Sequence, residues 1–129
     1  MPDISKTYQD LREGIRAICA EFPDDYHRNI DDERAYPEAF VDALTRDGWM
    51  AALIPEEYGG TGLGLTEASV IMEEINRSGG NSGACHGQMY NMNTLVLHGS
   101  EEQRQRLLPK LASGDLRLQS MGVTEPTTG

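Results

Sequence analysis

Apolar side chains in this chain recur at steps of three and four residues, in segments that proline or glycine brings to an end. That spacing places the side chains along one face of an α-helix, so each segment is predicted to be an amphipathic helix. Such segments follow one another along most of the chain. The predicted fold class is therefore all-α, an up-and-down domain of about five helices. The first apolar stripe consists of Ile4, Tyr8, Leu11, Ile15, Ile18, Cys19 and Phe22.

The boundaries of the later helices are marked by capping residues. Thr66 is predicted to cap the third helix, and either Asn81 or Ser82 the fourth. Residues 100–103 read Ser-Glu-Glu-Gln, which is the spacing of a capping box, so a fifth helix is predicted to begin there. Residues 24–35 are rich in Asp and Arg and are predicted to be a solvated connection between the first two helices.

The residue pattern changes at Leu118, from which strand-forming residues lead into a turn of Thr, Pro and Gly. Residues 1–115 are therefore predicted to form the helical domain, and residues 116–129 the first strand of a β domain. We expect this second domain to be truncated, because only its first residues are present. We therefore expect this chain to contribute only one wall of the functional site, from which the function has to be inferred.

The charge balance and the cysteines exclude several classes of protein. The formal net charge of −10 argues against nucleic acid as a partner, because binding to phosphates depends on lysine and arginine. No apolar stretch approaches the length of a membrane span, and the first residues lack a secretion signal, so a cytoplasmic location is expected. Cys19 and Cys85 lie in predicted helices, where buried, reduced thiols are favoured over a disulfide.

Two motifs invite a chemical interpretation that their geometry does not favour. Gly60-x-Gly62-x-Gly64 has neither of the common phosphate-loop spacings, and a structural loop that needs positive φ angles is favoured. Adjacent residues on a helix point about 100° apart, so Cys85 and His86 are not expected to form a nucleophile–base pair.

Neither the histidines nor the acidic clusters indicate a reactive centre. The histidines lack metal-ligand spacing, so no metal site is predicted. The acidic clusters are expected to be solvated, without the desolvation that tunes a carboxylate for acid–base catalysis. The residues concerned are His27, His86 and His98, together with Asp24-Asp25, Asp31-Asp32-Glu33 and Glu73-Glu74.

Three segments carry a more specific signal when they are taken in order. Residues 55–62 read PEEYGGTG, residues 98–103 read HGSEEQ with LPKLASG following at residues 108–114, and residues 123–126 read VTEP with Gly129 close behind. In this order the segments resemble the acyl-CoA dehydrogenase family. The resemblance covers nearly the whole chain.

The resemblance implies a fold and an activity. In that family a helical N-terminal domain, a middle β domain and a C-terminal helical domain together hold FAD and an acyl-CoA thioester, which is desaturated at the α,β position. This chain is then expected to be the N-terminal domain with the first β residues. The family's catalytic base lies in the C-terminal domain, so no catalytic residue is expected here, Glu125 included, and the fragment alone is expected to be inactive.

The resemblance also implies two sets of binding residues. Residues of the terminal segment are expected to contact the flavin, with an ordinary strand and turn as the alternative; they are Met121, Val123, Thr124 and Gly129. Residues on one face of the fourth helix are expected to face the acyl chain, with core packing as an equal alternative; they are Ser82, His86 and Tyr90.

The partners implied by the resemblance are an acyl-CoA substrate, an electron-transferring flavoprotein and, for the full-length protein, further copies of itself in a homotetramer. Two alternatives stay open at this point. Flavin oxidases and monooxygenases share the architecture, and a stand-alone helical interaction module would bind no flavin.

Overall fold

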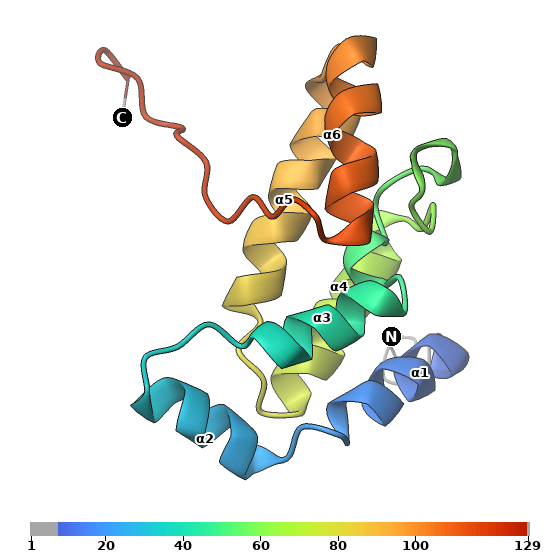
Figure 1. The fold of residues 1–129 in the computed structure, drawn as a ribbon. Coiled ribbons are helices and arrows are strands. Elements are labelled where there is room, and N and C mark those ends of the chain that lie inside the picture. The colour runs from blue at the N-terminus through green and yellow to red at the C-terminus, as the bar shows by residue number, and fades with distance from the viewer. Residues whose placement is uncertain (1–7, 129) are drawn as a thin grey trace, which may run out of the picture.

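The computed structural model describes residues 8–128, and α-helices make up most of this part of the chain (Figure 1). The predicted all-α fold class is confirmed, with six α-helices among the described residues rather than about five. Ile4 and Gly129 lie outside these residues. The elements are α1 (Gln9–Cys19), α2 (Asp24–Asp32), α3 (Glu38–Arg46), the 3-10 turns η2 (Trp49–Ala51) and η3 (Glu56–Tyr58), α4 (Leu65–Arg77), α5 (Gly83–His98) and α6 (Glu101–Ser113).

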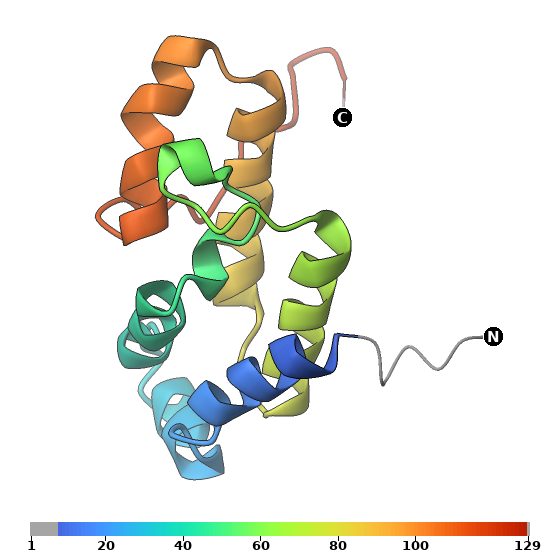
Figure 2. The same cartoon turned by 90° about the vertical axis from the view of Figure 1, so that its right-hand side faces the viewer.

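The helix α5 joins two parts of the molecule. Figure 2 shows α1, α2 and α3 at one end of α5, and α6 beside its other end. A larger apolar cluster packs α1, α3 and α4 against the first half of α5, and a smaller one packs α6 against the second half. The fully buried side chains of these clusters include Ile15, Phe40, Leu44, Ile71, Ile75, Met92, Leu108 and Leu111.

The helix α2 lies within residues 24–35, for which a solvated connection is predicted. No residue of α2 is buried, which agrees with the predicted solvation, but a helix was not predicted there. Pro23 occupies the N-cap position, and Asp24 and Asp25 lie in the first turn, where the helix dipole favours negative charge. The apolar residues of α2 are Tyr26 and Ile30, both half-buried, and a stripe of two residues is too short for apolar periodicity to reveal the helix.

The capping box predicted for the last helix is present at the start of α6. The backbone N–H of Gln103 donates to Ser100 Oγ over 3.2 Å, and the backbone N–H of Ser100 donates to Gln103 Oε1 over 2.8 Å. The Tyr58 hydroxyl donates to the Glu101 carboxylate in the same turn, at 2.8 Å from Oε2. The turn η3 is thereby tied to the beginning of α6.

The predicted caps of α4 and α5 need one correction. Thr66 does not cap α4, because this helix begins one residue earlier and Glu67 Oε2 accepts a hydrogen bond from the Gly64 N–H at 3.0 Å. At α5, Ser82 occupies the N-cap position but its side chain makes no capping bond, and Asn81 Oδ1 instead accepts from the Gly83 N–H at 2.9 Å.

The segment after α6 contains no strand within the described residues. Residues 117–124 have no regular secondary structure, and an isolated bridge joins Glu125 to Thr128. The predicted first strand does not form here because a strand needs a neighbour with which to exchange backbone hydrogen bonds. In Figure 1 this segment passes α5 and then leaves the helices.

No helix within residues 8–128 has the length and apolar character needed to cross a bilayer.

Candidate functional site

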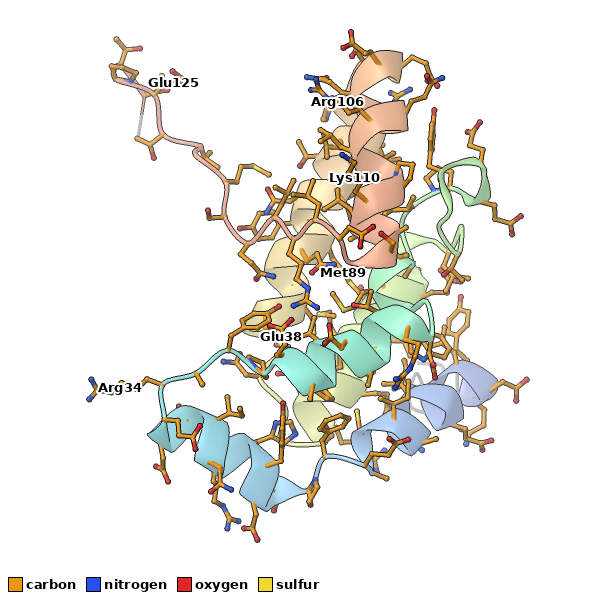
Figure 3. All side chains as sticks on the ribbon, viewed as in Figure 1. Arg34, Glu38, Met89, Arg106, Lys110 and Glu125 are labelled. Carbon is orange, nitrogen blue, oxygen red and sulfur yellow. The ribbon has the colours of Figure 1, made fainter. Side chains whose placement is uncertain are left out.

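A groove of about 220 Å³ lies between α4 and α5. The wall formed by α4 is apolar apart from Ser69, whereas the wall formed by α5 carries His86, Tyr90 and Asn93. These three residues follow one another at steps of four and three, which places them on one face of the helix. The apolar lining consists of Leu53, Leu65, Ala68, Met72 and Met89, the last of which is labelled on α5 in Figure 3.

Two of the three predicted substrate residues meet in this groove. The rings of His86 and Tyr90 lie 5.2 Å apart between centroids at an interplanar angle of 62°, an edge-to-face contact. The His86 side chain is exposed and that of Tyr90 is half-buried. Ser82 is not part of the groove; its carbonyl accepts the backbone N–H of His86 at 2.7 Å inside the first turn of α5.

Ser69 and Asn93 are lining residues that the sequence analysis missed. Asn93 lies three residues after Tyr90 on the same helical face, so helical spacing alone was a signal for it. Ser69 is contributed by α4, and its place depends on how the two helices pack, which the sequence does not show.

The two thiols are free and buried, as predicted. Cys85 is fully buried, and its burial raises the pKa of the thiol to about 12. Burial also raises the pKa of Cys19. Because the thiolate is the nucleophilic form, neither cysteine is suited to covalent catalysis. Among the described residues no group of three His, Cys, Asp or Glu side chains could hold a metal ion.

The glycine-rich loop is shaped by its own backbone needs. Gly59 and Gly62 have φ angles of 86° and 68°, which favour glycine strongly. A Cβ atom on Gly60 would lie 1.9 Å from the carbonyl oxygen of Ile54, so no side chain fits there. This supports the structural interpretation of the loop over a phosphate-binding one.

The terminal segment presents its main chain and side chains to solvent. Met121 is 39% exposed and Val123 is 72% exposed, and Thr124 is also exposed. Residues 120–124 make no hydrogen bond to any other described residue. An isoalloxazine ring has a polar edge and apolar faces, so exposed backbone N–H and C=O groups beside apolar side chains fit its needs. Gly129, the fourth residue of the predicted set, lies outside the described residues.

Comparison with known proteins gives a consistent family. The model of the acyl-CoA dehydrogenase N-terminal domain matches residues 5–115. A mitochondrial isovaleryl-CoA dehydrogenase of Solanum tuberosum is 44% identical over 127 residues, which cover 95% of this chain and 31% of that protein. A probable acyl-CoA dehydrogenase of Mycobacterium leprae is 31% identical over 112 residues, which cover 85% of this chain and 28% of that protein.

A solved structure described as the Tcur3481-Tcur3483 steroid ACAD is similar in fold, with a TM-score of 0.62 and 31% sequence identity. The match covers 89% of this chain and 31% of that one. The chain therefore spans about a third of the length of each of these relatives.

Proposed function

This chain belongs to the acyl-CoA dehydrogenase family as an N-terminal domain, and from that premise we propose that it is one part of a longer, FAD-dependent enzyme that desaturates acyl-CoA thioesters at the α,β position. Bound FAD would supply the redox chemistry by accepting the hydride that leaves the β carbon. The residues of this chain would bind and orient, while a carboxylate base from a later domain would take the α proton. The chain alone would be inactive.

The terminal segment is the proposed flavin-contacting wall. What supports this is that residues 120–124 hold free backbone N–H and C=O groups, next to the exposed side chains of Met121 and Val123. The Thr124 hydroxyl adds one more donor and acceptor. Gly129 completes the proposed set through the resemblance of the VTEP segment alone.

The groove between α4 and α5 is the proposed site for the far end of the acyl group. Its supporting observation is the meeting of His86 and Tyr90 opposite the apolar wall of α4. Ser82 stays a proposed substrate contact on resemblance alone. The relatives differ in what their names specify, isovaleryl-CoA in one case and a steroid in another, so we propose an acyl-CoA substrate without fixing the acyl group.

The proposal extends to the rest of the full-length protein. It would assemble as a homotetramer and pass electrons to an electron-transferring flavoprotein, in the cytoplasm. The relatives named above are mitochondrial or bacterial, so the compartment needs its own measurement, for which cell fractionation suffices.

Anaerobic mixing of the purified full-length protein with acyl-CoA thioesters tests the proposal. We expect a yellow protein whose flavin absorbance is bleached by a suitable thioester, with one enoyl-CoA formed per flavin reduced. The isolated chain should be colourless. Admission of oxygen then distinguishes a dehydrogenase from an oxidase or monooxygenase of the same fold, because rapid reoxidation of the reduced flavin by oxygen alone would indicate one of the latter. A colourless full-length protein that FAD does not reconstitute would favour a helical interaction module.

A further inference from the structure

The segment that leads to the proposed flavin-contacting residues is fastened to α3 by one arginine. Arg117 Nη1 donates to Glu38 Oε1 at 2.6 Å, and Arg117 Nη2 donates to the Asp42 carboxylate. Glu38 and Asp42 are one helical turn apart on α3, so the guanidinium spans both carboxylates. In Figure 3, Glu38 is labelled on α3 close to where the segment after α6 passes.

The arginine is well shielded although its partners are not. The Arg117 side chain is 17% exposed, against 65% for Glu38 and 56% for Asp42. Its guanidinium also lies 5.6 Å from the ring centroid of Tyr36, within the range of a cation–π contact. Charge-assisted hydrogen bonds of a planar guanidinium fix direction as well as distance. The contact therefore orients the chain at Arg117.

The same segment is held against α5 immediately afterwards. Asn91 Nδ2 donates to the Leu118 carbonyl at 3.2 Å, and Gln119 Nε2 donates to the Ala84 carbonyl at 3.1 Å. A Cβ atom on Gly87 would lie only 2.9 Å from the Gln119 carbonyl oxygen. Glycine at this position therefore lets the segment cross the helix at close range.

The crossing point is adjacent to the groove residues in the sequence of α5. Gly87 follows His86, and Asn91 follows Tyr90. Because consecutive residues of a helix point about 100° apart, the segment touches one face of α5 while the groove uses another. One rigid helix thus connects the two proposed binding surfaces.

We propose that Arg117 and Asn91 are positioning residues, which fix the flavin-contacting segment relative to the acyl-facing side of α5. Neither residue touches the reacting atoms in this role. They set the direction in which residues 120–124 leave the helices, and thereby the alignment of the thioester with the flavin. This inference rests on the proposed function.

We call the contacts of Arg117 with Glu38 and Asp42 the clamp. Hydrogen–deuterium exchange of the full-length protein tests whether the clamp holds the segment, and it does so without relying on enzyme activity. We expect Arg117→Met to speed exchange of the amides of residues 118–124, whereas exchange in α1 and α4 stays unchanged. The double variant Glu38→Gln, Asp42→Asn removes the carboxylate partners at exposed positions without emptying the core. This double variant should also speed exchange of residues 118–124, and it gives a second test in case Arg117→Met does not fold. Unchanged exchange in both variants would overturn the clamp.

Single-turnover reduction of the flavin by a saturating acyl-CoA tests the positioning role. Because small misplacements of reactants are costly, we expect Arg117→Met to slow flavin reduction roughly tenfold or more, with little change in the apparent Kd of the thioester. Asn91→Ala should act in the same direction, and Arg117→Lys should recover part of the rate. These comparisons are made at full FAD occupancy, so that weaker binding of FAD is not mistaken for slower flavin reduction.

Arg106→Met is the matched control. Arg106 is 61% exposed on α6, and its contact to Glu102 is a single one at 4.0 Å (Figure 3). We expect the flavin of this variant to be reduced by acyl-CoA at the wild-type rate. Faster exchange in the Arg117 variants with an unaltered reduction rate would refute the positioning role and leave the proposed function intact. An FAD-loaded wild-type protein that no acyl-CoA reduces would refute the proposed function, and the positioning role with it.

Discussion

Gln88 is a polar side chain in the interior of the molecule, fully buried on α5, and no residue within 8–128 makes a hydrogen bond with its Nε2 or Oε1. Burying an unpaired amide costs free energy, so replacing it with an apolar side chain of similar volume should stabilise the fold. We expect Gln88→Met to raise the free energy of unfolding by about 1 kcal/mol, as measured by urea denaturation. A lower stability would show instead that the amide has a partner beyond the described residues.

His86 allows a residue-scale test of the groove. We expect His86→Leu to make the groove more apolar and to raise kcat/KM for long, unbranched acyl-CoA thioesters relative to short ones by roughly threefold to tenfold. Steady-state kinetics with a series of chain lengths measures this ratio. Thr94→Val serves as the control, because Thr94 is exposed, is not among the residues that line the groove and donates to the Tyr90 carbonyl of its own helix. An unaltered ratio in His86→Leu would remove this residue from the acyl site.

At the scale of elements, α1 is held on α4 by a buried ionic network. Arg12 Nη1 donates to Glu74 Oε1 at 2.7 Å, and Arg16 Nε donates to Glu74 Oε2 at 2.8 Å. The Glu74 side chain is 1% exposed, so the predicted solvation of the Glu73-Glu74 cluster is wrong for Glu74, whereas Glu73 is 56% exposed. Hydrogen bonds from Arg16, and then from Arg12, lower the pKa of this carboxyl against the opposing effect of burial.

The lowered pKa of Glu74 fixes the sign of a pH effect. Its stabilising contribution is complete above the ordinary pKa of 4.5 and is lost as the pH falls through the lower folded value. We therefore expect acid to release α1 before the rest of the helices, as faster amide exchange in residues 9–19. Exchange that is uniform along the chain at every acidic pH would contradict this.

Glu74→Gln should reproduce that release at neutral pH. Removing one member of a buried ion pair leaves the opposite charges poorly compensated, so we expect a loss of about 3 kcal/mol in the free energy of unfolding. Glu102→Gln is the matched control, since Glu102 is 86% exposed and its pair with Arg106 is long; no measurable loss is expected there. Equal effects of the two variants in urea denaturation would contradict a special role for the network.

Sequence patterns predicted those elements whose side chains face a core. The apolar stripes around Ile15, Leu44 and Ile71 all correspond to helices with buried faces. The helix α2 escaped prediction because it buries no residue, and the terminal strand did not form because it lacks a partner. Apolar periodicity therefore predicts the helices that have a buried face. It does not predict a helix without buried residues, and it does not show whether a strand has a neighbour to pair with.

The candidate site shows the same division. The positions of His86 and Tyr90 on one face followed from their spacing, and the structure places both in the groove. The apolar wall from α4 did not follow, because it depends on how two helices pack. The clamp around Arg117 was also hidden, since it joins residues 75 and 79 positions apart in the sequence.

At the scale of the whole molecule, two surfaces lie on different sides of α5. They are the groove between α4 and α5 and the exposed segment that crosses the helix, and we propose that each is one part of a larger site. The chain spans 31% of the Solanum tuberosum relative, and we propose that later domains complete both. Light scattering of the full-length protein should then report a tetramer, whereas a monomer would contradict the proposed assembly.

An experimental structure of the full-length protein with FAD tests the central claim most directly, through the distances from residues 121–124 to the isoalloxazine ring. The account predicts a hydrogen bond of roughly 3 Å from the backbone or hydroxyl of Val123 or Thr124 to the polar edge of the ring. A flavin bound elsewhere, with residues 121–124 remote from the ring, would contradict it.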